Sequence, residues 1–229
     1  MSPLPANVTV SQHPCLQAKL SQLRSNSTST RETKSLVHEL SLLLASEALG
    51  KVLTVTTAGE DVSHMGAPFP ITKASPGRIV LVPILRSGLA MVDAFLTLLP
   101  EPIPVHHLGL FRERTTLQPV EYYNNLPTRV APPSGDDKPC DLAIIVDPVI
   151  ATGGTAEAAI QTLKEWGVPK ILVVSILSSA EGVTRAANEA EGVEIFVGAV
   201  DKELGGSGGG MIVPGVGDIG DRLFLTIGK

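Results

Sequence analysis

Thr152, Gly153, Gly154 and Thr155 are consecutive in the sequence and have the chemistry of a phosphate site, and an acid, Asp147, precedes them. Glycines let the main chain approach a ligand closely, and threonine hydroxyls add hydrogen-bond donors. The alanine-rich run after Thr155 predicts a helix, whose N-terminus favours an anion. The pattern therefore predicts a loop that holds a phosphate group. The alternative is a plain strand-to-helix turn in which a threonine is the N-cap.

Asp147 indicates which kind of ligand the predicted loop would bind. The segment from Asp147 to Thr155 contains no lysine, so it is not the Gly-Lys-Ser/Thr loop of nucleoside triphosphatases. An acid that follows a buried strand is unfavourable unless a polar partner is present. A carboxylate can accept hydrogen bonds from sugar hydroxyls while the glycines hold the phosphate. Together these residues predict a site for a 5-phosphoribosyl group.

The elements that must position this loop alternate between strands and helices. Short, β-branched, apolar runs predict strands covered on both faces, at residues 78–85, 105–110, 142–146, 171–177 and 194–200. Helical patterns follow three of them, at residues 86–99, 155–166 and 181–190. This alternation predicts an α/β fold with a mostly parallel sheet flanked by helices. Ligands of such sheets sit beyond the carboxyl ends of the strands, which here lead into residues 86–88, 147–155 and 178–179.

Segments outside this core complete a single expected domain, residues 1–229. Two helical patterns, at residues 11–23 and 34–49, predict N-terminal helices within an arm that covers residues 1–50. Residues 78–200 form the α/β core, interrupted by a proline-containing segment at 111–137 that predicts a long flexible β-arm. Residues 201–229 follow as a glycine-rich and turn-dense C-terminal segment.

Composition excludes several classes of function. The chain has 229 residues, 43% of them hydrophobic, and a net charge of −5 without a run of basic residues, so nucleic acid is not an expected partner. Cys15 and Cys140 are too few for a disulfide scaffold or a zinc site. No signal peptide and no apolar run of about 18 residues is present, so no membrane contact is expected. A soluble, cytoplasmic protein is the expectation.

Several motifs resemble those of the uracil phosphoribosyltransferases, which have the type I phosphoribosyltransferase fold. "VDPVIATGGT" at residues 146–155 is similar to the family's ribose-phosphate signature in its Asp-Pro form. The resemblance extends over nearly the whole chain, through "HPCLQAKLSQLRSNSTSTRE" (13–32), "VPILRSGLAMVDAFL" (82–96), "LFRERTTLQPVEYYNNLP" (110–127) and "MIVPGVGDIGDRLF" (211–224). These resemble the family's N-terminal helix and arm, pyrophosphate loop, flexible arm and uracil-recognition segment.

This resemblance implies transfer of the 5-phosphoribosyl group from 5-phospho-α-D-ribose 1-diphosphate (PRPP) to N1 of uracil, with Mg²⁺, giving UMP and diphosphate in pyrimidine salvage. It implies catalytic roles for Asp147, Arg112 and Asp218, and it assigns no direct metal ligand. The implied PRPP-binding residues are Arg86, Arg112, Asp147, Pro148, Val149, Ile150, Ala151, Thr152, Gly153, Gly154, Thr155 and Asp218. Uracil would be read by Ile212, Gly217, Asp218 and Ile219, largely through main-chain groups.

The sequence departs from the family pattern at a few positions and leaves other functions open. Met211 stands where relatives often have tyrosine, and Ile219 where many have alanine. One alternative is a catalytically silent regulator of the same fold that senses uridine nucleotides or binds RNA, and another is a purine-specific transferase. The presence of Arg86, Arg112, Asp147 and Asp218 favours the enzyme over the regulator. The Asp-Pro loop and the C-terminal segment disfavour the purine-specific transferase. The family also suggests a homodimer or higher homo-oligomer and, in some members, GTP as an effector.

Overall fold

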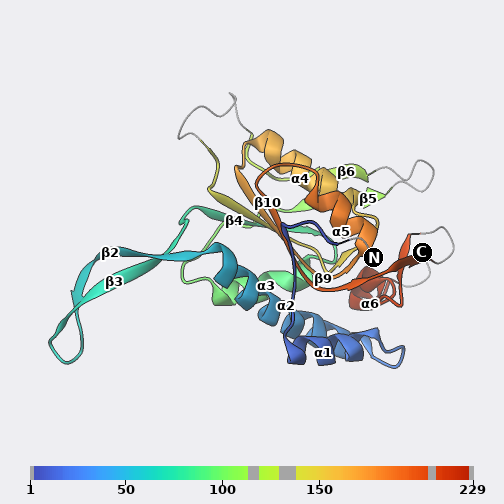
Figure 1. Cartoon of the computed structure of the whole chain (residues 1–229), viewed down its shortest axis with the longest axis horizontal. Coiled ribbons are helices and arrows are strands. Elements are labelled where there is room, and N and C mark those ends of the chain that lie inside the picture. Colours follow the sequence, from blue (N-terminus) through green and yellow to red (C-terminus); the bar gives the residue numbers. More distant parts are fainter. Residues whose placement is uncertain (1–2, 113–118, 129–137, 206–209, 227–229) are drawn as a thin grey trace.

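The computed structural model describes residues 3–112, 119–128, 138–205 and 210–226, and of Arg112 only the main chain. Its centre is an eight-stranded sheet (Figure 1). Seven strands lie in the order β1 (Val8–Val10), β10 (Val193–Asp201), β9 (Lys170–Ser179), β7 (Leu142–Val146), β4 (Ile79–Leu85), β5 (Leu108–Arg112) and β6 (Pro119–Asn124). The eighth, β8 (Val149–Ile150), pairs with β9. All pairs are parallel except β5 with β6, so the mostly parallel sheet is confirmed.

Helices cover both faces of the sheet, because its central strands are apolar on both. In β7, Ile144 and Val146 pack with the cluster that contains α1 (Pro14–Arg24), α2 (Thr30–Val52) and α3 (Leu89–Leu98). The alternate residues Ala143 and Ile145 pack with α4 (Gly154–Trp166) and α5 (Ala180–Ala187) on the other face. The two helical layers lie on opposite sides of the sheet in Figure 1. The predicted flanking helices are therefore confirmed, with ends shifted by a few residues.

The structure adds elements that the sequence patterns did not predict. Strand β1 joins the sheet beside β10, where the Asn7 side-chain amide donates to the carbonyls of Ala187 and Val193. Strands β2 (Thr54–Val62) and β3 (Pro68–Ser75) pair as an antiparallel hairpin that projects away from the sheet (Figure 1). Every residue of β2 is exposed, so no apolar alternation marked it in the sequence.

The C-terminal segment contains a small sheet and a short helix. Strands β11 (Glu203–Gly205) and β12 (Met211–Val213) pair antiparallel, and α6 (Ile219–Phe224) follows them. The expected arm at 111–137 begins as the β5–β6 pair, while residues 113–118 and 129–137 lie outside the described part of the chain. No helix in the described ranges is both long and apolar enough to cross a bilayer.

Candidate active site

Strands β5, β4 and β7 are neighbours in the sheet, and their carboxyl ends bring predicted site residues to one edge of it. Strands β4 and β7 are paired up to Pro83 and Val146, so the segments that begin at Arg86 and Asp147 emerge side by side. A hollow of about 290 Å³ there is lined by residues of these segments, of β5 and β6 and of the start of α6: Leu85, Arg86, Ser87, Leu110, Phe111, Tyr122, Asp147, Val149, Asp218, Ile219 and Gly220. A second hollow of about 220 Å³ shares Asp147 and Val149 with it and continues along the loop to Ala156.

The loop after β7 has the main-chain geometry of an anion site. Gly153, not a threonine, is the N-cap of α4, and no side chain among the described residues caps this helix end. The threonine N-cap that the plain-turn interpretation expected is therefore wrong. Gly153 adopts φ 82°, ψ −15°, and a Cβ added there would lie 2.6 Å from the Gly182 carbonyl oxygen. The first N–H groups of α4 point out of the helix beside the second hollow, which Thr152 and Thr155 line.

Strand β9 and helix α5 support this loop from behind. The Ser178 hydroxyl donates to the Ile150 carbonyl at 3.1 Å, and the Ser179 hydroxyl donates to the Ala151 carbonyl at 2.5 Å. Ser179 is also the N-cap of α5, where it accepts from the Gly182 N–H at 2.8 Å. These buried contacts hold the main chain of the loop in place, which an anion site made from N–H groups requires. Ser178 and Ser179 follow a predicted strand, but their role in supporting the loop was not foreseen.

Asp147 lies between the two hollows and has an unusual proton affinity. Its Oδ1 accepts from the Ser87 hydroxyl at 2.8 Å, and the Val149 N–H also donates to it. Asp147 is half-buried, and the desolvation of its carboxyl raises its pKa to about 7, although both hydrogen bonds act to lower it. The free protein therefore holds Asp147 partly protonated at neutral pH. Ser87, which the sequence did not single out as a site residue, is its side-chain partner.

Arg86 faces the same hollow from the start of the β4–α3 segment, and the Leu85–Arg86 peptide bond is cis. Its guanidinium donates to the Thr226 hydroxyl at 3.2 Å, lies 3.6 Å from Asp221 Oδ1 and stands over the Phe224 ring, 5.9 Å from its centre. About half of the Arg86 side chain is exposed (51%), so these contacts contribute little to stability. An anionic ligand can therefore replace them. Arg86 thus contacts the C-terminal segment where it lines the hollow.

Two of the four predicted base-reading residues, Asp218 and Ile219, line the same hollow. Asp218 is exposed and caps α6, accepting from the Asp221 N–H at 3.0 Å. Ile219 lines the hollow, whereas the side chain of Ile212 is buried in the core and Gly217 precedes Asp218 in a left-handed conformation at φ 69°. The structure thus brings Arg86, Asp147, Asp218 and Ile219 around one space. Tyr122 and Phe111 also line it, although neither was predicted as a site residue.

The side chain of one predicted arginine, Arg112, is not described by the structure. Arg112 ends β5, beside the strand that leads to Arg86, but its side chain lies outside the described part of the chain. Its role stays a prediction.

A carboxylate at the end of a central parallel strand, followed by a glycine turn into an open helix N-terminus, is the arrangement predicted for a phosphoribosyl site. The mostly parallel sheet flanked by helices is the fold of the type I phosphoribosyltransferases. Residues 10–226 match the family model described as Uracil phosphoribosyltransferase. The uracil phosphoribosyltransferase of Roseiflexus castenholzii is 44% identical over 220 residues, an alignment that covers 96% of this chain and 98% of that protein. The enzyme of that name from Desulfitobacterium hafniense strain DCB-2 is 43% identical over 223 residues, covering 96% and 99%. This chain therefore belongs to the uracil phosphoribosyltransferase family.

A solved structure agrees with this assignment at the level of the fold. The AQ2163 protein from Aquifex aeolicus superposes with a TM-score of 0.82 at 32% identity, covering 96% of this chain and 98% of that one. Family membership over nearly the full length makes this chain a phosphoribosyltransferase and supports a place in pyrimidine salvage.

Proposed function

We propose that this chain transfers the 5-phosphoribosyl group of PRPP to N1 of uracil, with Asp147 and the following loop as the sugar-phosphate site. The observation that carries this assignment is the placement of a partly buried carboxylate beside the open N-terminus of α4. N–H groups there suit the 5′-phosphate, while Asp147 can accept hydrogen bonds from ribose hydroxyls. The loop residues proposed for this role are Pro148, Val149, Ile150, Ala151, Thr152, Gly153, Gly154 and Thr155.

The reaction breaks the bond between C1′ and the diphosphate oxygen and forms a bond between C1′ and N1 of uracil. The electron pair of the broken bond leaves with diphosphate, so positive groups must face that oxygen. Arg86 is proposed to supply one such charge and Arg112 another. The N1 proton of uracil must also leave, and no side chain in the described site is assigned as its acceptor.

The uracil is proposed to lie against the segment from Ile212 to Ile219. Uracil presents two carbonyl acceptors and ring N–H donors, which main-chain groups can match. Asp218 and Ile219 line the hollow that also contains Asp147, so a base there would face the anomeric carbon of the sugar. Cytosine would place an amine where uracil has a carbonyl and leave buried groups unpaired.

Magnesium is the cofactor proposed for this site, and the available donors suit it. Asp147 and Asp218 line the same hollow, and carboxylate and phosphate oxygens are the ligands that Mg²⁺ prefers. The described residues contain no cluster of three or more His, Cys, Asp and Glu side chains that could hold a metal alone. The ion would therefore bind together with PRPP, where it would neutralise charge on the leaving diphosphate.

Substitution of Asp218 separates its proposed role toward PRPP from its role as a helix cap. Asp218→Asn keeps an acceptor for the Asp221 N–H but removes the charge, whereas Asp218→Ala removes both. Both variants are expected to lower turnover by about tenfold or more. Only the alanine variant should lose thermal stability, by about 0.5–2 kcal/mol, and in it catalysis should suffer more than folding. Steady-state kinetics and thermal unfolding measure the two effects. An alanine variant that loses its thermal transition at unchanged specific activity would make Asp218 purely structural.

One experiment distinguishes the proposed function from its rivals. The purified protein is incubated with PRPP, Mg²⁺ and, in separate reactions, uracil, cytosine, hypoxanthine or adenine. UMP from uracil alone, abolished by a chelator, is expected. A silent regulator would bind uridine nucleotides but give no product, and a purine enzyme would consume hypoxanthine or adenine instead. Added GTP in the same assay tests whether it is an effector.

A homodimer or higher homo-oligomer and a cytoplasmic location stay predictions. The hairpin of β2 and β3 supports the first, because it exposes apolar side chains, among them Val55, Val62, Met65 and Phe69. A two-stranded ribbon without a covered face is marginally stable in water, so a partner surface is expected to cover it.

A further inference from the structure

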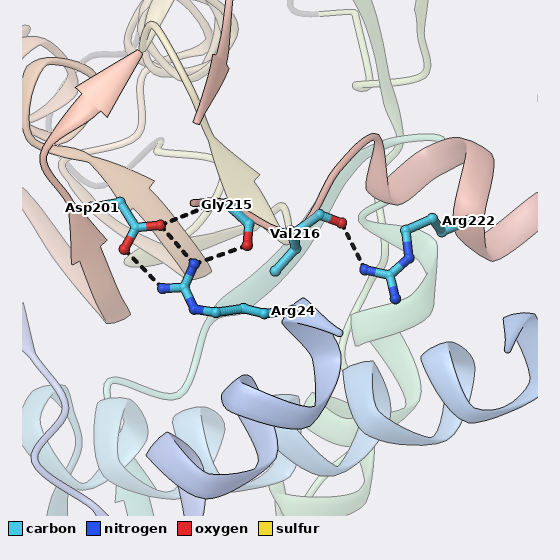
Figure 2. A network of polar contacts seen from close by, with 5 residues as sticks. All are labelled: Arg24, Asp201, Gly215, Val216 and Arg222. Carbon is cyan, nitrogen blue, oxygen red and sulfur yellow. Dashed lines mark hydrogen bonds and ion pairs between the residues drawn. The ribbon is translucent and has the colours of Figure 1, made fainter. Parts of the chain in front are cut away.

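The turn between β12 and α6 is held in place by arginines that come from other elements (Figure 2). Arg24, the last residue of α1, donates from Nη1 to the Gly215 carbonyl at 2.9 Å. The same guanidinium forms a two-bond ion pair with Asp201, with Nη1–Oδ2 at 2.7 Å and Nη2–Oδ1 at 2.8 Å. Asp201 ends β10 and accepts in turn from the Gly215 N–H at 3.0 Å. Both main-chain groups of Gly215 are therefore bound to this pair.

A second arginine holds the next residue of the turn. Arg222 of α6 donates from Nη1 to the Val216 carbonyl at 2.7 Å (Figure 2). The same Nη1 also donates to the Leu23 carbonyl at 2.7 Å. Its Nη2 reaches the Ser25 carbonyl at 3.4 Å. Arg222 therefore joins the turn to the carboxyl end of α1, the same helix end that carries Arg24. We call the ion pair of Arg24 and Asp201, together with Arg222, the arginine clamp.

The side chains of the turn can make no hydrogen bonds of their own. Residues 212–217 are Ile, Val, Pro, Gly, Val and Gly, none of which has a polar side chain. Ile212 and Val216 are buried in the core, and Gly215 has φ 62°, where a Cβ would lie 2.1 Å from the Ile212 carbonyl oxygen. The polar main-chain groups of Gly215 and Val216 must therefore find their partners in other parts of the chain.

The clamp is sheltered from water, which makes its contacts strong. The side chain of Asp201 is 10% exposed and that of Arg24 is 24% exposed. Charge-assisted, two-bond contacts in such surroundings fix geometry tightly. Removal of one partner leaves a buried charge without compensation, so the remaining groups must rearrange.

We propose that Arg24 is a positioning residue for uracil: together with Asp201 and Arg222 it fixes the main chain of residues 212–217 in the arrangement that reads the base. This inference rests on the proposed function. Arg24 is not among the residues that line either hollow, so its effect on the reaction would pass through Gly215. The phosphate loop is supported separately by Ser178 and Ser179. Loss of the clamp should therefore affect uracil much more than PRPP.

Kinetics of Arg24→Ala, Arg24→Lys and Asp201→Ala test this proposal. The Arg24→Ala variant is expected to raise KM for uracil by about tenfold or more, to leave KM for PRPP within about twofold, and to reduce the preference for uracil over cytosine. Arg24→Lys keeps the charge but cannot make the paired bonds and the Gly215 contact together, so an intermediate KM for uracil is expected. The Arg24→Ala and Asp201→Ala effects on this KM should be non-additive in the double variant.

Lys19→Ala is the matched control, since Lys19 lies on the same helix and pairs with Glu39 instead of with the turn. It should leave both KM values unchanged. A folded Arg24→Ala protein with unchanged KM for uracil, or with both KM values raised equally, would overturn the proposal. If Arg24→Ala fails to fold, Arg24→Lys decides by the same two outcomes. A wild-type protein that makes no UMP would instead contradict the proposed function.

Discussion

Replacement of Asp147 by asparagine is expected to lower turnover by about tenfold or more while it stabilises the free protein at neutral and higher pH. Asparagine keeps the shape of the side chain and one acceptor oxygen, but it has no charge to hold the ribose hydroxyls. The loss should appear in kcat/KM for PRPP more than in KM for uracil. Rates like those of the wild type with both substrates would refute the sugar-binding role of Asp147.

The stability part of this prediction follows from the raised pKa of Asp147. In the folded protein the pKa is about 7, against roughly 3.9 in an unfolded chain. Below about pH 4 the carboxyl is protonated in both states and favours neither. As the pH rises toward 7 the unfolded state loses its proton first, so stability falls and the full loss is present above pH 7. At neutral and higher pH, Asp147 therefore lowers the free energy of unfolding of the protein.

Denaturant unfolding at pH 5 and pH 8 measures this effect. The advantage of Asp147→Asn over the wild type in free energy of unfolding should be larger at pH 8 than at pH 5, by about 1–3 kcal/mol. Ser87→Ala is the control, since it removes the hydroxyl that donates to Asp147 and so raises the pKa further. In this variant the loss of free energy of unfolding between pH 5 and pH 8 should be larger than in the wild type. Identical pH dependence in the wild type and the asparagine variant would contradict the raised pKa.

Gly153→Ala is expected to damage PRPP binding with little effect on uracil. The φ of 82° is strained for alanine, and its Cβ would lie 2.6 Å from the Gly182 carbonyl oxygen, so the loop must move away from α5. Displaced N–H groups no longer converge on the 5′-phosphate. KM for PRPP should rise by about tenfold or more and stability should fall by about 1–3 kcal/mol.

Binding of ribose 5-phosphate, followed by calorimetry, isolates this effect from catalysis. The matched control is Gly50→Ala in α2, where an added Cβ meets nothing within 4 Å. That variant should bind ribose 5-phosphate normally and be equally or slightly more stable, because alanine favours a helix. Unchanged affinity of Gly153→Ala for ribose 5-phosphate would show that the loop does not hold the phosphate.

The core and the loop after β7 were predictable because buried strands and helices have recognisable apolar patterns in the sequence. Strand β7 was predicted at residues 142–146 and occupies the same residues, since all five are buried and apolar. Helix α4 was predicted to within one residue, because its alanine-rich run ends at Gly167 in a left-handed turn. Arg86, Asp147 and Asp218 were predicted as one site, and the structure brings them around one hollow. Their roles in the reaction stay predictions.

Other features could not be predicted, because no local pattern in the sequence indicates them. The β2–β3 hairpin has no buried face, so its strands lack alternation. Helix α6 has six residues within a glycine- and proline-rich segment, too few for a helical period to stand out. Arg24 and Asp201 are 177 residues apart in the sequence, and each alone is an ordinary surface-type residue. Only the fold makes them partners.

The arginine clamp implies that the two substrates are selected by parts of the protein that can vary separately. In the proposed arrangement the sugar and phosphate bind to the middle of the chain. The turn proposed to read the nucleobase is anchored instead by the end of α1. Changes of specificity toward modified pyrimidines could then arise from substitutions near residue 24, without any loss of donor affinity. A search for such variants should therefore randomise the contact between α1 and the C-terminal turn, and not only the residues that would touch the pyrimidine ring.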